Sequence, residues 1–363
     1  MVRLVVILLL SINVLFGQYR DIPDIVTSVA QSTANWLKIE TNPRAVGLGG
    51  SFVASGRGIG AVSYNPASIA FIEGEEGYVF RTQYIADITH NVVSYGRKMT
   101  SSDFVGFHLF YLDSGPMKVT NREYPDGTGA DFHVQSIAFR TTYGRRLTDR
   151  LKVGVNLNFI RDEIHTVSMN TLAFDVGSNF DTGIYGFRLG MSVTNFGPEV
   201  QYHGDGLQQT VPDTVDIDGV LHKVTETFPL PLVFRLGVEN EVVGPNSVFI
   251  QNNTHSVKVT VDGVVPNDYT FTSHVGLEYG FNNMAYVRTG MRLGHDTASF
   301  SGGGGIRLKT RPMTFHIDYA FVDYGILKLS HQVGLGVEFC CHIMISFMNT
   351  EGDRAMKVDN ALS

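Results

Sequence analysis

Apolar and polar residues alternate with a period of two along most of this 363-residue chain. Between Leu151 and Phe159, every second residue is Leu, Val or Phe, and Lys, Gly or Asn stands between them. This is the period of a β-strand whose two faces meet different surroundings. We count about fourteen such stretches, which predicts an all-β chain. The expected strands span residues 77–86, 89–98, 103–113, 132–144, 151–161, 168–181, 184–194, 231–240, 247–260, 270–280, 284–294, 298–309, 312–321 and 330–339.

The connections between these stretches indicate which solvent the apolar face meets. Links after even-numbered strands are short, whereas links after odd-numbered strands include the longest, 114–131 and 195–230, and also 261–269. Bacterial outer-membrane barrels sort their loops in this way, and a soluble barrel would have to expose its arginine-bearing face instead. Apolar residues on nearly every strand also exceed what one narrow interior holds. We therefore predict a transmembrane antiparallel β-barrel of about 14 strands over residues 77–339, surrounded by outer-membrane lipid.

The polar face of such strands would line the lumen. Charged residues make up 17% of the chain and the formal net charge is −7, so no basic face is available for nucleic acid. The charges expected in the lumen are those of Arg235, Arg288, Arg292, Glu278 and Asp318. Within this set we expect the carboxylates to balance the arginines.

The two ends of the chain differ from the alternating part. Arg3, the apolar run Leu4–Leu10 and the small residue Gly17 are typical of a secretory signal peptide over residues 1–17. Residues 18–76 follow as a separate glycine-rich region, in which 24–39 could form a short helix. Residues 340–363 are expected to form a periplasmic tail.

No motif predicts an enzyme. Nucleophile-elbow, zincin and phosphate-loop patterns are all missing from the sequence. The run Ser301–Gly305 lies within an alternating strand, so we interpret it as a place where another segment packs close to the wall rather than as a phosphate site. We predict no catalytic residue, no cofactor and no metal site.

The stretch "ANWLKIETNPRAVGLGGSFVASGRGIGAVSYNPASIAF" resembles the N-terminal signature of the PorV/PorQ family of outer-membrane proteins. The matching motifs are Leu37-Lys38-Ile39, Arg44–Gly50 and Asn65-Pro66-Ala67, and residues 318–339 are similar to the closing hairpin of the family. Wider relatives are FadL-type hydrocarbon transporters, in which the Asn-Pro-Ala motif lies in a hatch that plugs the lumen. The tail after residue 339 departs from the family ending.

The resemblance and the residues together predict a plug. Pro66 fixes its own φ and favours an extended Asn65, whose side chain can bond to the backbone two residues on. Residues 37–71 are therefore expected inside the barrel, with Arg44 paired to a lumen carboxylate; the alternative is a loose periplasmic lead-in. The residues assigned to this hatch motif are Arg44, Gly47, Gly49, Gly50, Asn65, Pro66 and Ala67.

The resemblance also implies a function. A PorV-like protein is a non-enzymatic component of the type IX secretion system, which receives cargo bearing a C-terminal β-sandwich signal domain from the translocon and carries it to the attachment complex. Extracellular loops would make the contact, and a PorV-like role is not distinguished from a PorQ-like one. The candidate contact residues are Phe196, Pro198, Tyr202, Leu207, Val211 and Pro212. Two alternatives remain open: a FadL-like transporter of hydrophobic small molecules, and a structural porin without a plug.

Overall fold

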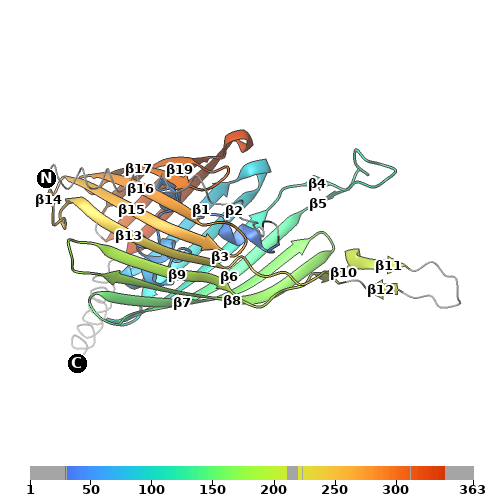
Figure 1. Cartoon of the computed structure of the whole chain (residues 1–363), viewed down its shortest axis with the longest axis horizontal. Coiled ribbons are helices and arrows are strands. Elements are labelled where there is room, and N and C mark those ends of the chain that lie inside the picture. The colour runs from blue at the N-terminus through green and yellow to red at the C-terminus, as the bar shows by residue number, and fades with distance from the viewer. Residues whose placement is uncertain (1–28, 30, 211–219, 223, 311, 340–363) are drawn as a thin grey trace, which may run out of the picture.

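The computed structural model describes residues 29, 31–210, 220–222, 224–310 and 312–339, and these residues form a closed antiparallel barrel (Figure 1). The first strand pairs with the second and also with the last, so the sheet closes on itself. The sheet has sixteen strands, of which β10 (His203–Gly204) and β14 (Ile250–Gln251) are two residues long. The other fourteen make the wall, so the predicted fold class is confirmed. They are β1 Glu75–Gln83, β2 Thr89–Lys98, β3 Asp103–Asp113, β6 Val134–Arg146, β7 Leu151–Ile164, β8 Val167–Asp181, β9 Arg188–Phe196, β13 Val233–Gly244, β15 His255–Pro266, β16 Thr272–Phe281, β17 Ala285–Leu293, β18 Phe300–Lys309, β19 Met313–Asp323 and β20 Leu329–Phe339.

The outer surface of the wall is apolar and its interior is polar. On β7, Leu157 and Phe159 are 44% and 46% exposed, whereas Asn156 and Asn158 beside them are 1% and 2% exposed. Only a hydrocarbon solvent stabilises such an arrangement, and a closed ring leaves no unpaired strand edge within it. The chain is therefore a bacterial outer-membrane barrel. No helix among the described residues is long and apolar enough to cross a bilayer.

The two ends of the barrel carry different connections (Figure 1). The links from β3 to β6 and from β9 to β13 project as arms at one end, which we call the outer end because long loops of such barrels face the exterior. The first arm contains β4 (Met117–Lys118) and β5 (Asp131–Phe132); the second contains β10, η6 (Asp205–Leu207), β11 (Gln208–Thr210) and β12 (Val220–His222). Short helices η5 (Ile85–Asp87) and η7 (Gly325–Leu327) lie in two other outer links. The opposite, inner end has short turns.

Three expectations about element boundaries are wrong. The strand expected over 247–260 begins only at His255, because Asn252 Oδ1 accepts hydrogen bonds from the backbone N–H of Thr254 and His255, both 2.8 Å, and holds a turn there. As a result, 261–266 is strand rather than loop, and the expected third long loop at 261–269 is reduced to 267–271. The strand expected from residue 184 begins at Arg188, because positive φ angles at Gly183, Tyr185 and Gly186 form a turn.

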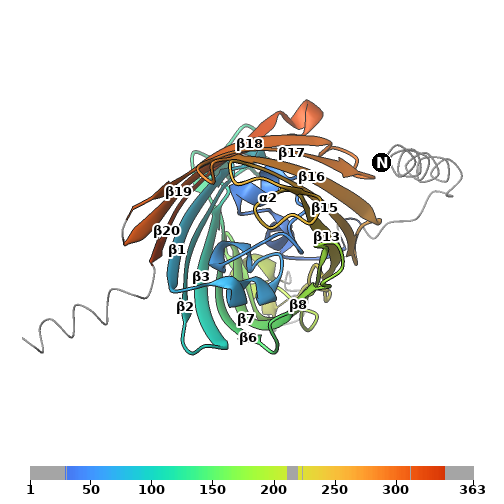
Figure 2. The ribbon, with the colours of Figure 1, turned by 90° about the vertical axis from the view of Figure 1, so that its left-hand side faces the viewer.

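The segment before β1 lies inside the ring of strands (Figure 2). It contains η2 (Asn35–Lys38), α2 (Pro43–Gly47), η3 (Ile59–Ala61) and η4 (Pro66–Phe71). We call residues 32–40 the leader and residues 41–72 the hatch. Of the short helix expected within 24–39, the described residues show the four residues of η2. Residues 24–28 and 30, the signal peptide and the 340–363 tail lie outside the described residues.

Candidate functional site: a hatch between two cavities

Inward-facing glycines on nine wall strands meet the hatch. A Cβ atom on any of these glycines would come within 3.0 Å of a hatch atom, so only glycine admits the hatch at this depth. We call this set the glycine belt. Its members are Gly96, Gly106, Gly144, Gly154, Gly177, Gly190, Gly237, Gly276 and Gly290.

At four of these positions, Gly154, Gly190, Gly276 and Gly290, the nearest hatch atom belongs to the backbone rather than to a flexible side chain. A Cβ on Gly154 would lie 2.6 Å from the Ala67 nitrogen, and one on Gly290 would lie 2.6 Å from the Gly49 Cα. Gly49 and Gly50 themselves have φ of +69° and +84°, which lets the chain reverse directly after α2. Next to this turn, Gly47 meets the glycine run of β18: its Cβ would stand 3.4 Å from the Gly303 Cα.

The Asn-Pro-Ala motif begins η4 and ties the hatch to the wall. Asn65 is fully buried and extended, with φ of −153°, and its Oδ1 accepts a hydrogen bond from the Ala67 N–H at 3.0 Å. Its Nδ2 donates to the carbonyl oxygens of Val53 (2.9 Å) and Ser178 (2.8 Å). Asn65 therefore caps the helix and joins two parts of the hatch to β8.

Charged groups of the wall hold the hatch from several sides. Arg44 donates Nε and Nη2 to Glu278 at 3.0 and 2.9 Å, a bidentate pair, and Arg57 pairs with Glu239 at 2.6 Å. The Asp262 carboxylate accepts the backbone N–H of Phe52 (2.7 Å) and of Val53 (2.9 Å).

All five charges expected in the lumen face inward, but they do not balance as expected. Arg288 bonds to both Glu278 (2.7 Å) and Asp318 (2.5 Å). Arg292 instead pairs with Glu40 of the leader and donates to the Gly49 carbonyl at 3.1 Å. Arg235 donates to Thr194 Oγ1 at 3.0 Å, and no described carboxylate forms an ion pair with it. Sequence reasoning missed Glu40 because its partner is 252 residues away.

A cavity of about 500 Å³ lies on the outer side of the hatch. Its lining combines apolar side chains with charged groups of both signs, because Glu40 and Asp268 also line it and form ion pairs with Arg292 and Lys38. The lining includes Ile39, Val233, Val264, Leu327, Lys38, Arg235, Arg292, His274, Tyr269 and Tyr324. A second cavity of about 350 Å³ lies on the inner side and is lined by Arg44, Arg288, Glu76, Glu338 and other polar residues. The hatch thus separates an outer, partly apolar space from an inner, polar one.

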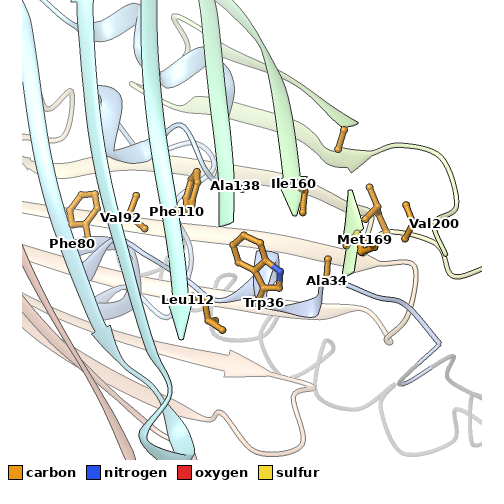
Figure 3. Close-up of a cluster of buried hydrophobic side chains, with 12 residues drawn as sticks. Ala34, Trp36, Phe80, Val92, Phe110, Leu112, Ala138, Ile160, Met169 and Val200 are labelled. Atoms are coloured by element: carbon orange, nitrogen blue, oxygen red, sulfur yellow. The ribbon is translucent and has the colours of Figure 1, made fainter. Parts of the chain in front are cut away.

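Another part of the outer lumen holds an apolar cluster (Figure 3). Trp36 of the leader lies at its centre and packs edge-on to His90, with ring centroids 5.8 Å apart. Wall residues such as Phe110 and Ile160 join loop residues Val200 and Leu230 in the same cluster. An apolar layer therefore runs across the lumen to the side where β8 meets β9.

The wall itself is interrupted on that side. The β8–β9 ladder shifts register after the pair Val176–Val193, because the Asn195 N–H donates to the Asp175 carboxylate (2.7 Å) and Asn195 takes a φ of +64°. Beyond this point one more pair, Phe174–Phe196, joins the two strands, and the same edge of β8 then pairs with the short strand β10. A cavity of about 380 Å³ lies between β8 and residues 198–203. The sequence showed no proline-broken strand, but Asn195 near the end of β9 and Gly197 and Pro198 directly after it were a usable signal.

The candidate contact residues of the long loop are not one surface. Phe196 is 64% exposed at the end of β9, and Pro198 is exposed at the wall interruption. Tyr202 turns its hydroxyl inward, toward Thr33 (2.6 Å) and Asp162 (3.2 Å), so it is not a free contact residue. Leu207 is half-buried in η6, and Val211 and Pro212 lie outside the described residues.

Comparison with known proteins supports the fold. No family model and no curated protein matches the chain. Among solved structures it is similar to the CymD monoaromatic hydrocarbon channel (13% identity, 83% of this chain and 98% of that one, TM-score 0.52). It is similar to the toluene transporter TbuX of Ralstonia pickettii (13%, 83% and 99%, TM-score 0.51) and to a FadL homologue of Pseudomonas aeruginosa (10%, 83% and 98%, TM-score 0.52). The chain therefore has a FadL-like barrel fold.

Proposed function

We propose that this outer-membrane barrel is a transporter-type protein that takes a hydrophobic small molecule into its outer cavity. The observation that carries the proposal is the cavity of about 500 Å³ that is bounded by leader residues Asn35, Lys38, Ile39 and Glu40, a size typical of small-molecule sites. The interrupted wall between β8 and β9 adds a second feature that a hydrophobic solute could use. The similar barrels named for toluene and monoaromatic hydrocarbons support the same solute class.

The hatch argues against an open structural porin. The glycine belt holds residues of the hatch against nine strands of the wall, and the outer and inner cavities lie on opposite sides of it. A solute in the outer cavity would therefore meet a seated plug, not a water-filled bore.

Filling the cavity tests the proposal. Val264 lines the outer cavity and is 7% exposed, whereas its neighbour Val265 is 44% exposed on the lipid face. Toluene that binds only the folded state should raise the unfolding midpoint in a saturable way. We expect Val264→Phe to raise the half-saturating toluene concentration at least tenfold and Val265→Phe to leave it unchanged. Equal half-saturation in both variants would contradict the proposal.

A second candidate, a PorV-like role in type IX secretion, is favoured by the two arms that project beyond the barrel rim (Figure 1). Loops held away from the cavity suit contact with a protein, since loops on a rigid scaffold carry recognition. The partners would be the translocon, the attachment complex and cargo C-terminal domains.

Shortening one arm separates the two candidates. We expect replacement of residues 119–130 by a Gly-Ser turn to reduce capture of a purified cargo C-terminal β-sandwich domain at least tenfold, with the toluene response unchanged. If capture is equally strong without the arm, docking through this arm is wrong; if no cargo domain is captured by the unaltered protein, the secretion role fails.

A further inference from the structure

The leader and the longest loop meet at one carboxylate on the wall. Asp162 lies on β7 and is 5% exposed. Its Oδ1 accepts the indole N–H of Trp36 at 2.6 Å, and its Oδ2 accepts the hydroxyl of Tyr202 at 3.2 Å. One residue of the leader and one of the loop between β9 and β13 thus share a single group.

Neutral donors compensate this buried charge. No described cation forms an ion pair with Asp162, so its two oxygens are satisfied by the bonds from Trp36 and Tyr202 together with one from the Ser136 side chain. Burial raises the pKa of the Tyr202 phenol to about 12, so the hydroxyl stays protonated and donates at physiological pH. Losing either donor leaves a buried carboxylate partly unsatisfied, and this makes the two segments depend on each other.

Further contacts join the same two segments. The Thr33 N–H donates to the Pro229 carbonyl at 3.1 Å, and Thr33 Oγ1 lies 2.6 Å from the Tyr202 hydroxyl. Val200 and Phe228 bridge the two sides of the loop base through paired backbone bonds of 2.9 Å. Val200 and Leu230 belong to the same apolar cluster as Ala34 and Trp36, and Figure 3 labels Val200, Ala34 and Trp36 within it. Leader and loop base form one packed unit.

We propose that Asp162, Trp36 and Tyr202 form a latch that couples the position of the longest outer loop to the packing of the apolar cluster in the outer lumen. A protein or ligand that draws the loop base away removes Tyr202 from Asp162, weakens the hold on Trp36 and loosens the cluster. Binding at the loop thereby changes the affinity for a solute that displaces Trp36. By linkage, that solute changes the affinity of the loop for its binding partner by the same factor. The coupling to a solute rests on the proposed function, because that function places solute entry at the outer lumen. The latch between leader and loop does not require a solute.

Trp36 supplies the readout, because it is the only tryptophan in the chain. The probe is streptavidin on a biotin attached at His203→Cys, an exposed position in β10, in a background in which Cys340 and Cys341 are replaced by Ser. We expect streptavidin to raise acrylamide quenching of Trp36 at least twofold. In Tyr202→Phe, quenching should already be raised before streptavidin and should not rise further.

The matched control is Tyr124→Phe on the other arm, where the ring is 58% exposed. It should quench as the unaltered protein does and should keep the full response to streptavidin. A Trp36 signal that ignores streptavidin, or a Tyr202→Phe variant that responds like the control, would overturn the latch. If Tyr202→Phe loses the heat-modifiable migration of a folded barrel, Asp162→Asn, which replaces one acceptor oxygen of the latch by an amide nitrogen that cannot accept, takes its place with the same expected response. Because no solute is present, failure here is distinct from failure of the toluene experiment.

Discussion

Replacing Gly290 by alanine should unseat the hatch. The new Cβ would lie 2.6 Å from the Gly49 Cα and nearer still to the Gly49 nitrogen, and both are backbone atoms that cannot rotate away. Inserting one carbon into a packed site typically costs about 1–3 kcal/mol, and a backbone contact places this variant at or above about 3 kcal/mol. The hatch can lower that cost only by moving away from the glycine belt. A conducting path through the lumen should therefore open.

Two measurements check this expectation. Single-channel recording in planar bilayers should show steady conductance for Gly290→Ala and none for the unaltered protein, and the temperature at which the barrel loses heat-modifiable migration should fall. Gly77→Ala is the control, because Gly77 lies on β1 and a Cβ there would meet nothing nearer than 3.8 Å. Silent bilayers with Gly290→Ala, at an unchanged melting temperature, would show that the hatch tolerates the added carbon.

Replacing Glu278 by glutamine should be the most destabilising change of a single charge. Glu278 is 3% exposed and bonds both Arg44 of the hatch (2.9 Å) and Arg288 of β17 (2.7 Å). Its loss leaves Asp318 as the remaining partner of Arg288 and no ion pair for Arg44. Breaking one partner out of a buried pair costs about 3–5 kcal/mol, because the other charge stays buried and unpaired.

Urea unfolding of the folded barrel in detergent measures this cost. Glu163→Gln provides the matched change, since the Arg161–Glu163 pair at 3.1 Å is about half-exposed and surface pairs contribute about 0–1 kcal/mol. The double variant Arg44→Met with Glu278→Gln should recover part of the loss, because it removes the unpaired cation as well. An equal effect of Glu278→Gln and Glu163→Gln would mean that the hatch pairing contributes nothing to stability.

The wall was predictable from the sequence because each strand carries its own evidence. The Leu151–Phe159 alternation needs no knowledge of the neighbouring strands, and β2 and β3 begin and end where the pattern predicts. The start of β15 was misplaced: the consecutive apolar residues 248–250 lie within the expected strand, but the side chain of Asn252 closes a turn directly after them. Local polar bonds overrode the period there.

The contacts of the hatch could be predicted only in part. The capping role of Asn65 was predictable, because Pro66 follows it and its hydrogen bond to Ala67 lies only two residues away in the sequence. The glycine belt and the Asp162 junction depend on which wall residues stand at the same height, and that is set by the pairing register of all fourteen strands. One signal was accessible: glycine recurs at inward positions of successive strands, as in the cross-strand pairs Gly96–Gly106 and Gly144–Gly154. The PorV/PorQ resemblance stays a prediction.

The glycine belt also constrains how the molecule is assembled. The hatch touches strands made early, such as β2 and β3, and through α2 it packs on β17 to β20, which are made last. Because the gaps between the hatch and the wall are too small for a single added carbon, the hatch could not be inserted into a barrel that had already closed. The sheet must therefore fold around its own N-terminal segment before β1 pairs with β20 and closes the barrel. It follows that the cellular insertion machinery has to release a barrel that already contains its plug.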